Sequence, residues 1–167
     1  MNGKGLTATN TSTEVALIAT ALIASATDVA AIAPHVLDDL TEPGTRQVLE
    51  IVCDLIAAHR PHSTIAVADE LQRRGLLAGH TGQQVKMVLT EASSAGRLAN
   101  PLALSTYAAT LCAEAYRHRF AEIGKALVEA ASCAPEWDLL PLLRQAGTDA
   151  VQHAKKLAAL RGEDIPA

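Results

Sequence analysis

The side chains best able to do chemistry are few, and their spacing does not build a known active site. A P-loop nucleotide site needs the pattern G-x-x-x-x-G-K-[ST], because its backbone amides hold the phosphates that the lysine reaches. Gly-Lys pairs occur at Gly3-Lys4 and Gly124-Lys125. The first leaves no room for the upstream glycine, and the second has Arg119 at that position. The sequence therefore predicts no ATPase of the P-loop type.

The histidines and cysteines do not have the spacing of a metal site or of a nucleophilic active site. His59 and His62 are three residues apart, but Pro61 breaks the helix that would align their rings. The three cysteines lie far apart among apolar neighbours, without a C-x-x-C pair, which favours packed thiols in a reducing compartment. We expect no catalytic residue, no metal and no cofactor, and an enzyme of unusual chemistry remains an alternative.

Composition and charge narrow the class of protein. Hydrophobic residues make up 49% of the 167 residues but aromatic residues only 2%, so the core must be aliphatic and suits close helix packing. A net charge of −4 argues against a protein that mainly neutralises phosphates, and the basic run Arg117–Arg119 is flanked by Glu114 and Glu122. No apolar run reaches the roughly 18 residues of a membrane span. No secretory signal is recognised, so we expect a cytoplasmic protein without membrane contact.

Capping residues and apolar spacing predict short helices in the first part of the chain. Thr11 and Glu14 form a capping box before the first helix, which is expected over roughly residues 12–25. The expected starts of the next four helices are Asp28, Thr41, Ser63 and Thr81. The third helix should bury one aliphatic face, formed by Val48, Ile51, Val52, Leu55 and Ile56.

Two longer helices are expected after residue 100. Asn100-Pro101 is a strong helix start, and the apolar stripe that follows implies one helix of about 30 residues. Residues 132–138 turn the chain, and a second stripe runs from Leu139 to Leu157. Helices joined by a short turn lie antiparallel.

The predicted architecture is therefore all-α, a small orthogonal bundle of short helices followed by a long antiparallel helical hairpin. The expected divisions are a disordered tail at 1–11, the bundle at 12–99, the hairpin at 100–160 and a C-terminal tail at 161–167.

The segment Thr45–Leu77, TRQVLEIVCDLIAAHRPHSTIAVADELQRRGLL, resembles the signature of the N-terminal domain of DnaB-type replicative helicases. In that family a helix opening with His-Arg and an aliphatic run is followed by a Gly/Pro loop, a capping Asp and a helix ending Leu-x-x-x-Gly-x-Leu. Thr45 stands in place of the histidine and Ser63 in place of the aspartate, which it can replace as a cap. The matching positions are Arg46, Val48, Leu49, Pro61, Leu71, Gly75 and Leu77.

The resemblance extends to residues 12–160. The segment Leu102–Phe120 is similar to a later stretch of the family, with Tyr107, Leu111 and Arg117 at its marked positions, and TEVALIATALI stands where the family has its opening helix. The family continues through a linker into an ATPase motor, which we expect this chain to lack. The resemblance leaves open whether the chain is a stand-alone protein, half of a split helicase or an isolated domain.

The resemblance implies a non-catalytic interaction module of DNA replication. Such a module would form a homodimer or higher oligomer through its hairpin and dock a primase, a replicative helicase or a loader protein, without strong nucleic-acid binding by itself. The implied interface residues are Tyr107, Leu111, Tyr116, Phe120, Ile123, Leu127, Leu143 and Leu157. Packing within the hairpin must claim at least half of them.

A DNA-binding regulator is the alternative from another class. Short helices with a turn at Gly75 could mimic helix-turn-helix geometry, and Arg73-Arg74 could contact phosphates. The acidic net charge counts against this reading.

Overall fold

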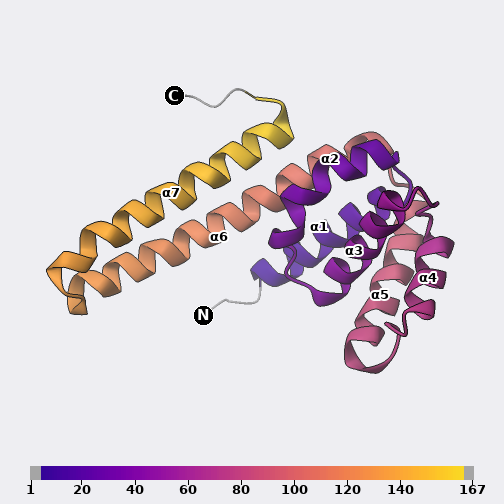
Figure 1. Ribbon diagram of the computed structural model, residues 1–167, viewed down its shortest axis with the longest axis horizontal. Coiled ribbons are helices and arrows are strands. Elements are labelled where there is room, and N and C mark those ends of the chain that lie inside the picture. The colour runs from indigo at the N-terminus through magenta and orange to yellow at the C-terminus, as the bar shows by residue number, and fades with distance from the viewer. Residues whose placement is uncertain (1–4, 164–167) are drawn as a thin grey trace. The chain divides into compact units, whose positions relative to one another are not determined.

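The computed structural model describes residues 5–163, with side chains from residue 13 onward, and all regular structure in that range is helical. The all-α prediction is confirmed. The α-helices are α1 (Gly5–Ala21), α2 (Ala26–Val36), α3 (Pro43–Ala57), α4 (Thr64–Arg73), α5 (Gly79–Gly96), α6 (Leu104–Cys133) and α7 (Glu136–Arg161) (Figure 1). Short 3-10 turns at Leu37–Asp39 and Pro101–Ala103 precede α3 and α6.

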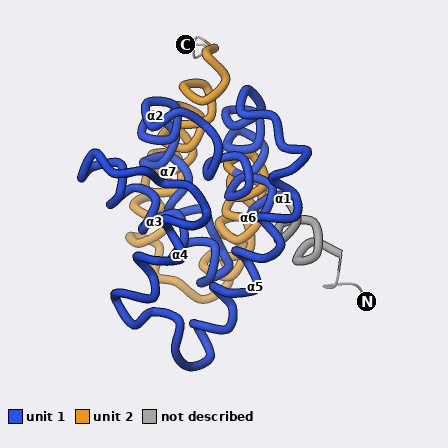
Figure 2. Tube along the Cα trace, turned by 90° about the vertical axis from the view of Figure 1, so that its right-hand side faces the viewer, with its two compact units in different colours: residues 1–111 blue, residues 112–167 orange. Residues whose placement is uncertain are grey.

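Two compact units divide the chain, residues 1–111 and residues 112–167 (Figure 2). Their division lies within α6, whereas the expected division at residue 100 marks where the hairpin begins. Unit 1 is therefore the bundle together with the first turns of α6, and unit 2 is the rest of α6 with α7.

Helix α3 is the centre of unit 1, because it packs against α1, α2, α4 and α5. Its predicted aliphatic face is buried at Val48, Ile51, Val52 and Leu55, while Ile56 is partly exposed. The surrounding helices complete an aliphatic core without a buried aromatic side chain among the described residues. Close helix packing with small side chains is what the composition favours. The core residues contributed by these neighbours include Leu17, Ile18, Val29, Val67, Leu71, Val85 and Leu89.

Glu14 joins α1 to the start of α3 instead of closing a local capping box. Its carboxylate is fully buried and accepts hydrogen bonds from the Thr41 backbone N–H and Oγ1 at 2.7 and 2.6 Å. It also accepts from the Glu42 N–H at 3.2 Å and from Thr45 Oγ1 at 2.5 Å. A buried carboxylate needs several donors, and a helix N-terminus supplies them. The side chain of the expected partner, Thr11, lies outside the described residues.

Four of the five expected helix starts are wrong, and one is confirmed. Helix α1 begins at Gly5 rather than near residue 12. Helix α2 begins earlier, because Ser25 Oγ rather than Asp28 caps it, accepting the Asp28 N–H at 3.1 Å. Glu42, not Thr41, is the N-cap residue of α3, since the Thr41 hydroxyl is engaged by Glu14. Helix α4 starts after Ser63 as expected.

Helix α5 starts at Gly79 rather than Thr81, because a tight turn precedes it. Gly79 has a φ of 70°, which an L side chain rarely adopts. Gly82 packs so closely on the preceding turn that a Cβ there would lie 2.2 Å from the carbonyl carbon of Leu77. Both glycines are therefore needed to bring α5 back against the bundle.

Unit 2 is an antiparallel pair of helices, as predicted (Figure 1). Ala134 and Pro135 connect α6 to α7, and Gly162 ends α7 with a φ of 66°. Of the helices in the described range, none combines the length and apolarity that a membrane crossing requires.

Candidate interaction surface

A stripe of exposed apolar side chains follows α7. Leu140, Leu143 and Val151 are each between 53% and 57% exposed, and their spacing of three and eight residues places them along one side of the helix. Gly147 lies between Leu143 and Val151, with no atom within 4 Å of the place where a Cβ would stand. This side of α7 is therefore apolar, and it has a shallow gap at Gly147, where no side chain projects.

A matching stripe follows α6. Phe120 is 57% exposed, Leu127 is partly exposed, and Gly124 lies between them with open space above it. Both stripes are displaced by roughly a quarter turn from the rows that face the partner helix, at 100° per residue. On both helices the stripe is rotated in the same direction about the helix axis, viewed from the N-terminus of each helix. Because α6 and α7 run antiparallel, rotations in the same direction place the two stripes on the same side of the hairpin. We call this the apolar side of unit 2.

The opposite side of the hairpin is mostly polar, although Leu142 of α7 is exposed there. Lys125 Nζ pairs with Glu122 at 2.7 Å and holds the pKa of that carboxyl below its usual range, mainly through the hydrogen bond. Gln145 donates to Asp149 at 2.8 Å. A depression of about 400 Å³ on this side is lined by Arg119, Glu122, Ile123, Asp149, Gln152 and His153. Unit 2 therefore has one side suited to solvent and one suited to a partner.

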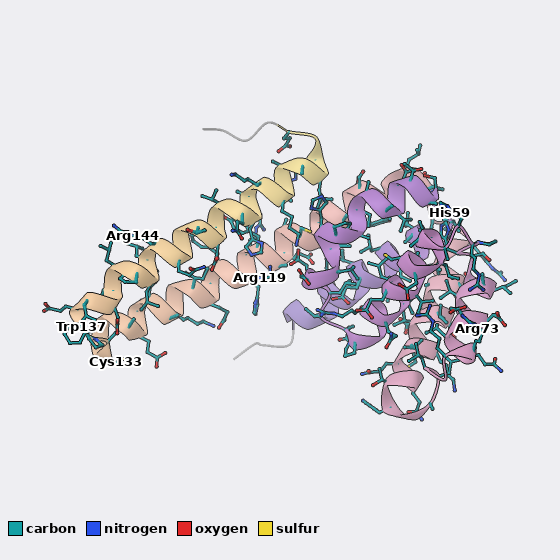
Figure 3. The ribbon with its side chains drawn as sticks, in the orientation of Figure 1. His59, Arg73, Arg119, Cys133, Trp137 and Arg144 are labelled. Atoms are coloured by element: carbon teal, nitrogen blue, oxygen red, sulfur yellow. The ribbon has the colours of Figure 1, made fainter. Side chains whose placement is uncertain are left out.

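A few aromatic and basic side chains hold the two helices of unit 2 together. The rings of Tyr116 and His153 lie 5.9 Å apart, and those of Tyr116 and Phe120 lie 6.0 Å apart. An N–H of Arg119 lies 3.0 Å from Nε2 of His153 (Figure 3). Tyr116 thus links the interior of the hairpin to the edge of its apolar side.

The structure separates the predicted interface residues into two groups. Leu111 is 1% exposed and belongs to the core of unit 1, and Tyr107 is partly exposed in the same unit. The other six lie in unit 2, where Phe120 and Leu143 are exposed and the rest are partly exposed. Only the exposed and half-exposed members of unit 2 are available to a partner.

Several exposed apolar residues of unit 2 did not appear in the sequence-based interface. Leu140 and Val151 lie outside the predicted interface, because the sequence predicts a single apolar stripe on this helix, from Leu139 to Leu157. Trp137 is 78% exposed at the turn of the hairpin, close to the exposed Cys133 (Figure 3). The overlooked signal was a second apolar row, offset from the first by one residue.

Sites for other chemistry are poorly formed in the described part of the chain. Within it, no three His, Cys, Asp or Glu side chains gather where a metal ion could sit. Burial, together with the neighbouring carboxylates, raises the pKa of the Cys53 thiol, which disfavours the nucleophilic thiolate. Arg73 and Arg74, on which the DNA-binding reading depends, both donate to Glu70 and remain partly exposed, with Asp54 and Asp69 beside them.

Comparison with known proteins identifies the fold. No protein-family model matches the chain, and no curated protein does. A solved structure that is similar is the crystal structure of the N-terminal domain of DnaB helicase from Mycobacterium tuberculosis. The two are 21% identical and superpose with a TM-score of 0.54 over 84% of this chain and 95% of that domain. The chain therefore has the fold of a DnaB N-terminal domain, and the resemblance noted in the sequence is confirmed at the level of fold.

Proposed function

We propose that this chain is a non-catalytic interaction module of DNA replication, which self-associates through its hairpin in the cytoplasm and docks a primase, a replicative helicase or a loader. The observation that carries the proposal is the apolar side of unit 2, on a fold shared with the N-terminal domain of a DnaB helicase. A side of this kind supports partner binding, because contiguous exposed apolar surface on a soluble domain usually marks an interaction site.

The energetics favour a weak pair of hairpins. Fully burying a large apolar side chain contributes about 1.5–3 kcal/mol, so a half-exposed one adds roughly 1 kcal/mol when a partner covers the rest. Phe120, Leu140, Leu143 and Val151 from two copies would together contribute about 8 kcal/mol. Association costs on the order of 4–15 kcal/mol, so Tyr116 and Leu127 must add contacts for a stable dimer.

The glycines favour a partner that is itself a helix. Gly124 and Gly147 leave open space at the middle of the two stripes. Two helices approach most closely where small residues face one another, which increases the contact made by their larger neighbours. A second hairpin fits this shape better than a flat or irregular surface.

The test is the mass of the protein by light scattering after size exclusion, alone and mixed with the helicase-binding domain of primase from the same source. We expect a homodimer that gains mass with primase. A dimer that gains no mass would remove primase as the partner, and mixing with helicase or loader would follow. A protein that is monomeric at all concentrations would refute self-association.

A further inference from the structure

In unit 1, an arginine cluster joins the end of α3 to α4. The carboxylate of Glu70 is fully buried and accepts four hydrogen bonds from three arginines. Arg60 donates at 2.8 Å, Arg73 at 2.5 and 3.1 Å, and Arg74 at 2.7 Å. A further N–H of Arg74 donates to Asp54 at 2.6 Å. We call the four residues His59, Arg60, Arg73 and Arg74 the cationic corner.

The three arginines are fixed by hydrogen bonds, but most of their N–H donors make none within the described residues. A guanidinium has five N–H donors, so the five hydrogen bonds to Glu70 and Asp54 leave most of the donors of the three arginines unused within the described residues. The side chains of Arg60, Arg73 and Arg74 are 44%, 64% and 38% exposed. Glu70 lies beneath them as a fixed anion, because the arginine hydrogen bonds lower its pKa to about 2. Solvent therefore meets fixed guanidinium groups rather than mobile ones.

A second, independent feature of the cationic corner is the left-handed backbone conformation of His59. Three helices of the chain end in the same way, with an N–H bonded five residues back, after a residue in the left-handed region. Two of them use glycine, at Gly75 and Gly162, whereas α3 uses His59 at a φ of 53°. A non-glycine residue there costs roughly 1 kcal/mol. His59 is exposed, and its side chain makes no hydrogen bond within the described residues. His59 directly precedes Arg60 in the sequence. Figure 3 shows His59 and Arg73 along the same edge of unit 1.

We propose that the cationic corner docks an acidic segment of a partner protein, with one or two carboxylates of that segment binding the exposed guanidinium groups. The planar N–H donors of arginine match a carboxylate in pairs, as Arg73 already does with Glu70. Fixed donors lose little side-chain entropy on binding, which favours a small site. This site is separate from the apolar side of unit 2 and does not depend on hairpin pairing.

The surrounding charges favour a peptide over a duplex. Asp54 and Asp69 are exposed beside the arginines, and Asp69 interacts electrostatically with Arg73. These carboxylates and the net charge of −4 would repel any continuous run of anions, so a phosphate backbone is disfavoured relative to a segment that carries only one or two carboxylates. A short acidic segment can place its carboxylates between them.

Fluorescence anisotropy with a labelled octapeptide that carries two adjacent glutamates among neutral residues tests the proposal on the full chain. We expect weak binding that Arg73→Gln reduces at least fivefold and His59→Gly reduces about twofold. Arg97→Gln removes another exposed arginine of unit 1 and should leave the affinity unchanged. Asp69→Asn removes a competing carboxylate at an exposed position and should raise the affinity about twofold.

Several results would overturn the proposal. The proposal is wrong if the wild-type protein does not bind the peptide. It is also wrong if Arg73→Gln and Arg97→Gln reduce the peptide affinity equally, because that result would indicate unspecific charge attraction. If a labelled 20-base-pair duplex bound more tightly than the peptide and lost affinity with Arg73→Gln, the corner would be a nucleic-acid site instead. Should Arg73→Gln fail to fold by circular dichroism, the Asp69→Asn variant decides, and an unchanged affinity counts against the proposal.

Discussion

Replacing Glu14 by alanine is expected to weaken the bundle far more than removing an ordinary surface carboxylate. The side chain is fully buried and accepts four hydrogen bonds from the segment that begins α3. Its removal separates α1 from the start of the central helix and leaves those donors without their acceptor.

The expected loss follows from how each donor is placed. Thr41 is exposed, so water can replace the carboxylate at its N–H and hydroxyl at little cost. The buried Thr45 hydroxyl and the partly buried Glu42 N–H lose their acceptor, at about 1.5 kcal/mol or less each, since the single hydroxyl hydrogen of Thr45 can turn to the Glu42 carbonyl oxygen 2.8 Å away. With the lost packing of the side chain, we expect Glu14→Ala to lower the free energy of unfolding by about 3 kcal/mol.

Urea unfolding followed by far-ultraviolet circular dichroism measures this loss. For a slope of about 2 kcal/mol per molar, the midpoint should fall by about 1.5 M. Glu14→Gln keeps the shape and one acceptor oxygen, so it should lose roughly half as much. Glu50→Ala, which removes an exposed carboxylate from α3, is the matched control and should change stability by less than about 0.5 kcal/mol.

A double-mutant cycle with Thr45→Ala separates the hydrogen bond from general damage. We expect a coupling energy of about 1 kcal/mol between Glu14 and Thr45, because their atoms are in direct contact. If Glu14→Ala unfolds within about 0.5 kcal/mol of the wild type, the carboxylate does not hold α1 to α3, and the reasoning is refuted.

Three further predictions concern the same unit and its turns. The pKa of Glu70 is depressed from 4.5 to about 2, so the stability it contributes is present above pH 4.5 and is lost as the pH falls toward 2; Glu70→Gln should abolish this part of the acid-unfolding profile. Gly82→Ala should destabilise by at least about 2 kcal/mol in urea unfolding, because its Cβ would meet the Leu77 backbone, and a neutral effect would show that the turn can shift. His59→Gly should raise the free energy of unfolding by about 0.5–1 kcal/mol by relieving the left-handed strain, and a loss of stability would mean that the histidine makes a contact of its own.

The sequence could predict the helices because their signals are local. Proline, glycine and capping residues mark the boundaries within a few positions, and the aliphatic face of α3 repeats at helical spacing. The antiparallel hairpin followed from two long apolar stripes joined by a short turn. These features need no knowledge of which helices meet.

The long-range partners could not be predicted in this way. Glu14 looks like half of a local capping box, yet its donors lie 27 to 31 residues away, since burial selected the nearest helix N-terminus. Similarly, α7 carries two adjacent apolar rows, and only the position of α6 decides which of them is covered. Leu143 belongs both to the predicted stripe from Leu139 to Leu157 and to the predicted interface, and it is exposed in the structure.

Sedimentation equilibrium of three proteins tests most directly whether the apolar side of unit 2 is an interface between copies. The wild type, Leu143→Asp on the apolar side and Gln152→Asp on the polar side are compared at matched concentrations, with helix content checked by circular dichroism. We expect the wild type and Gln152→Asp to form dimers and Leu143→Asp to be a folded monomer. Equal masses for all three would contradict this expectation, because a charge placed on the proposed contact would then have no effect on association.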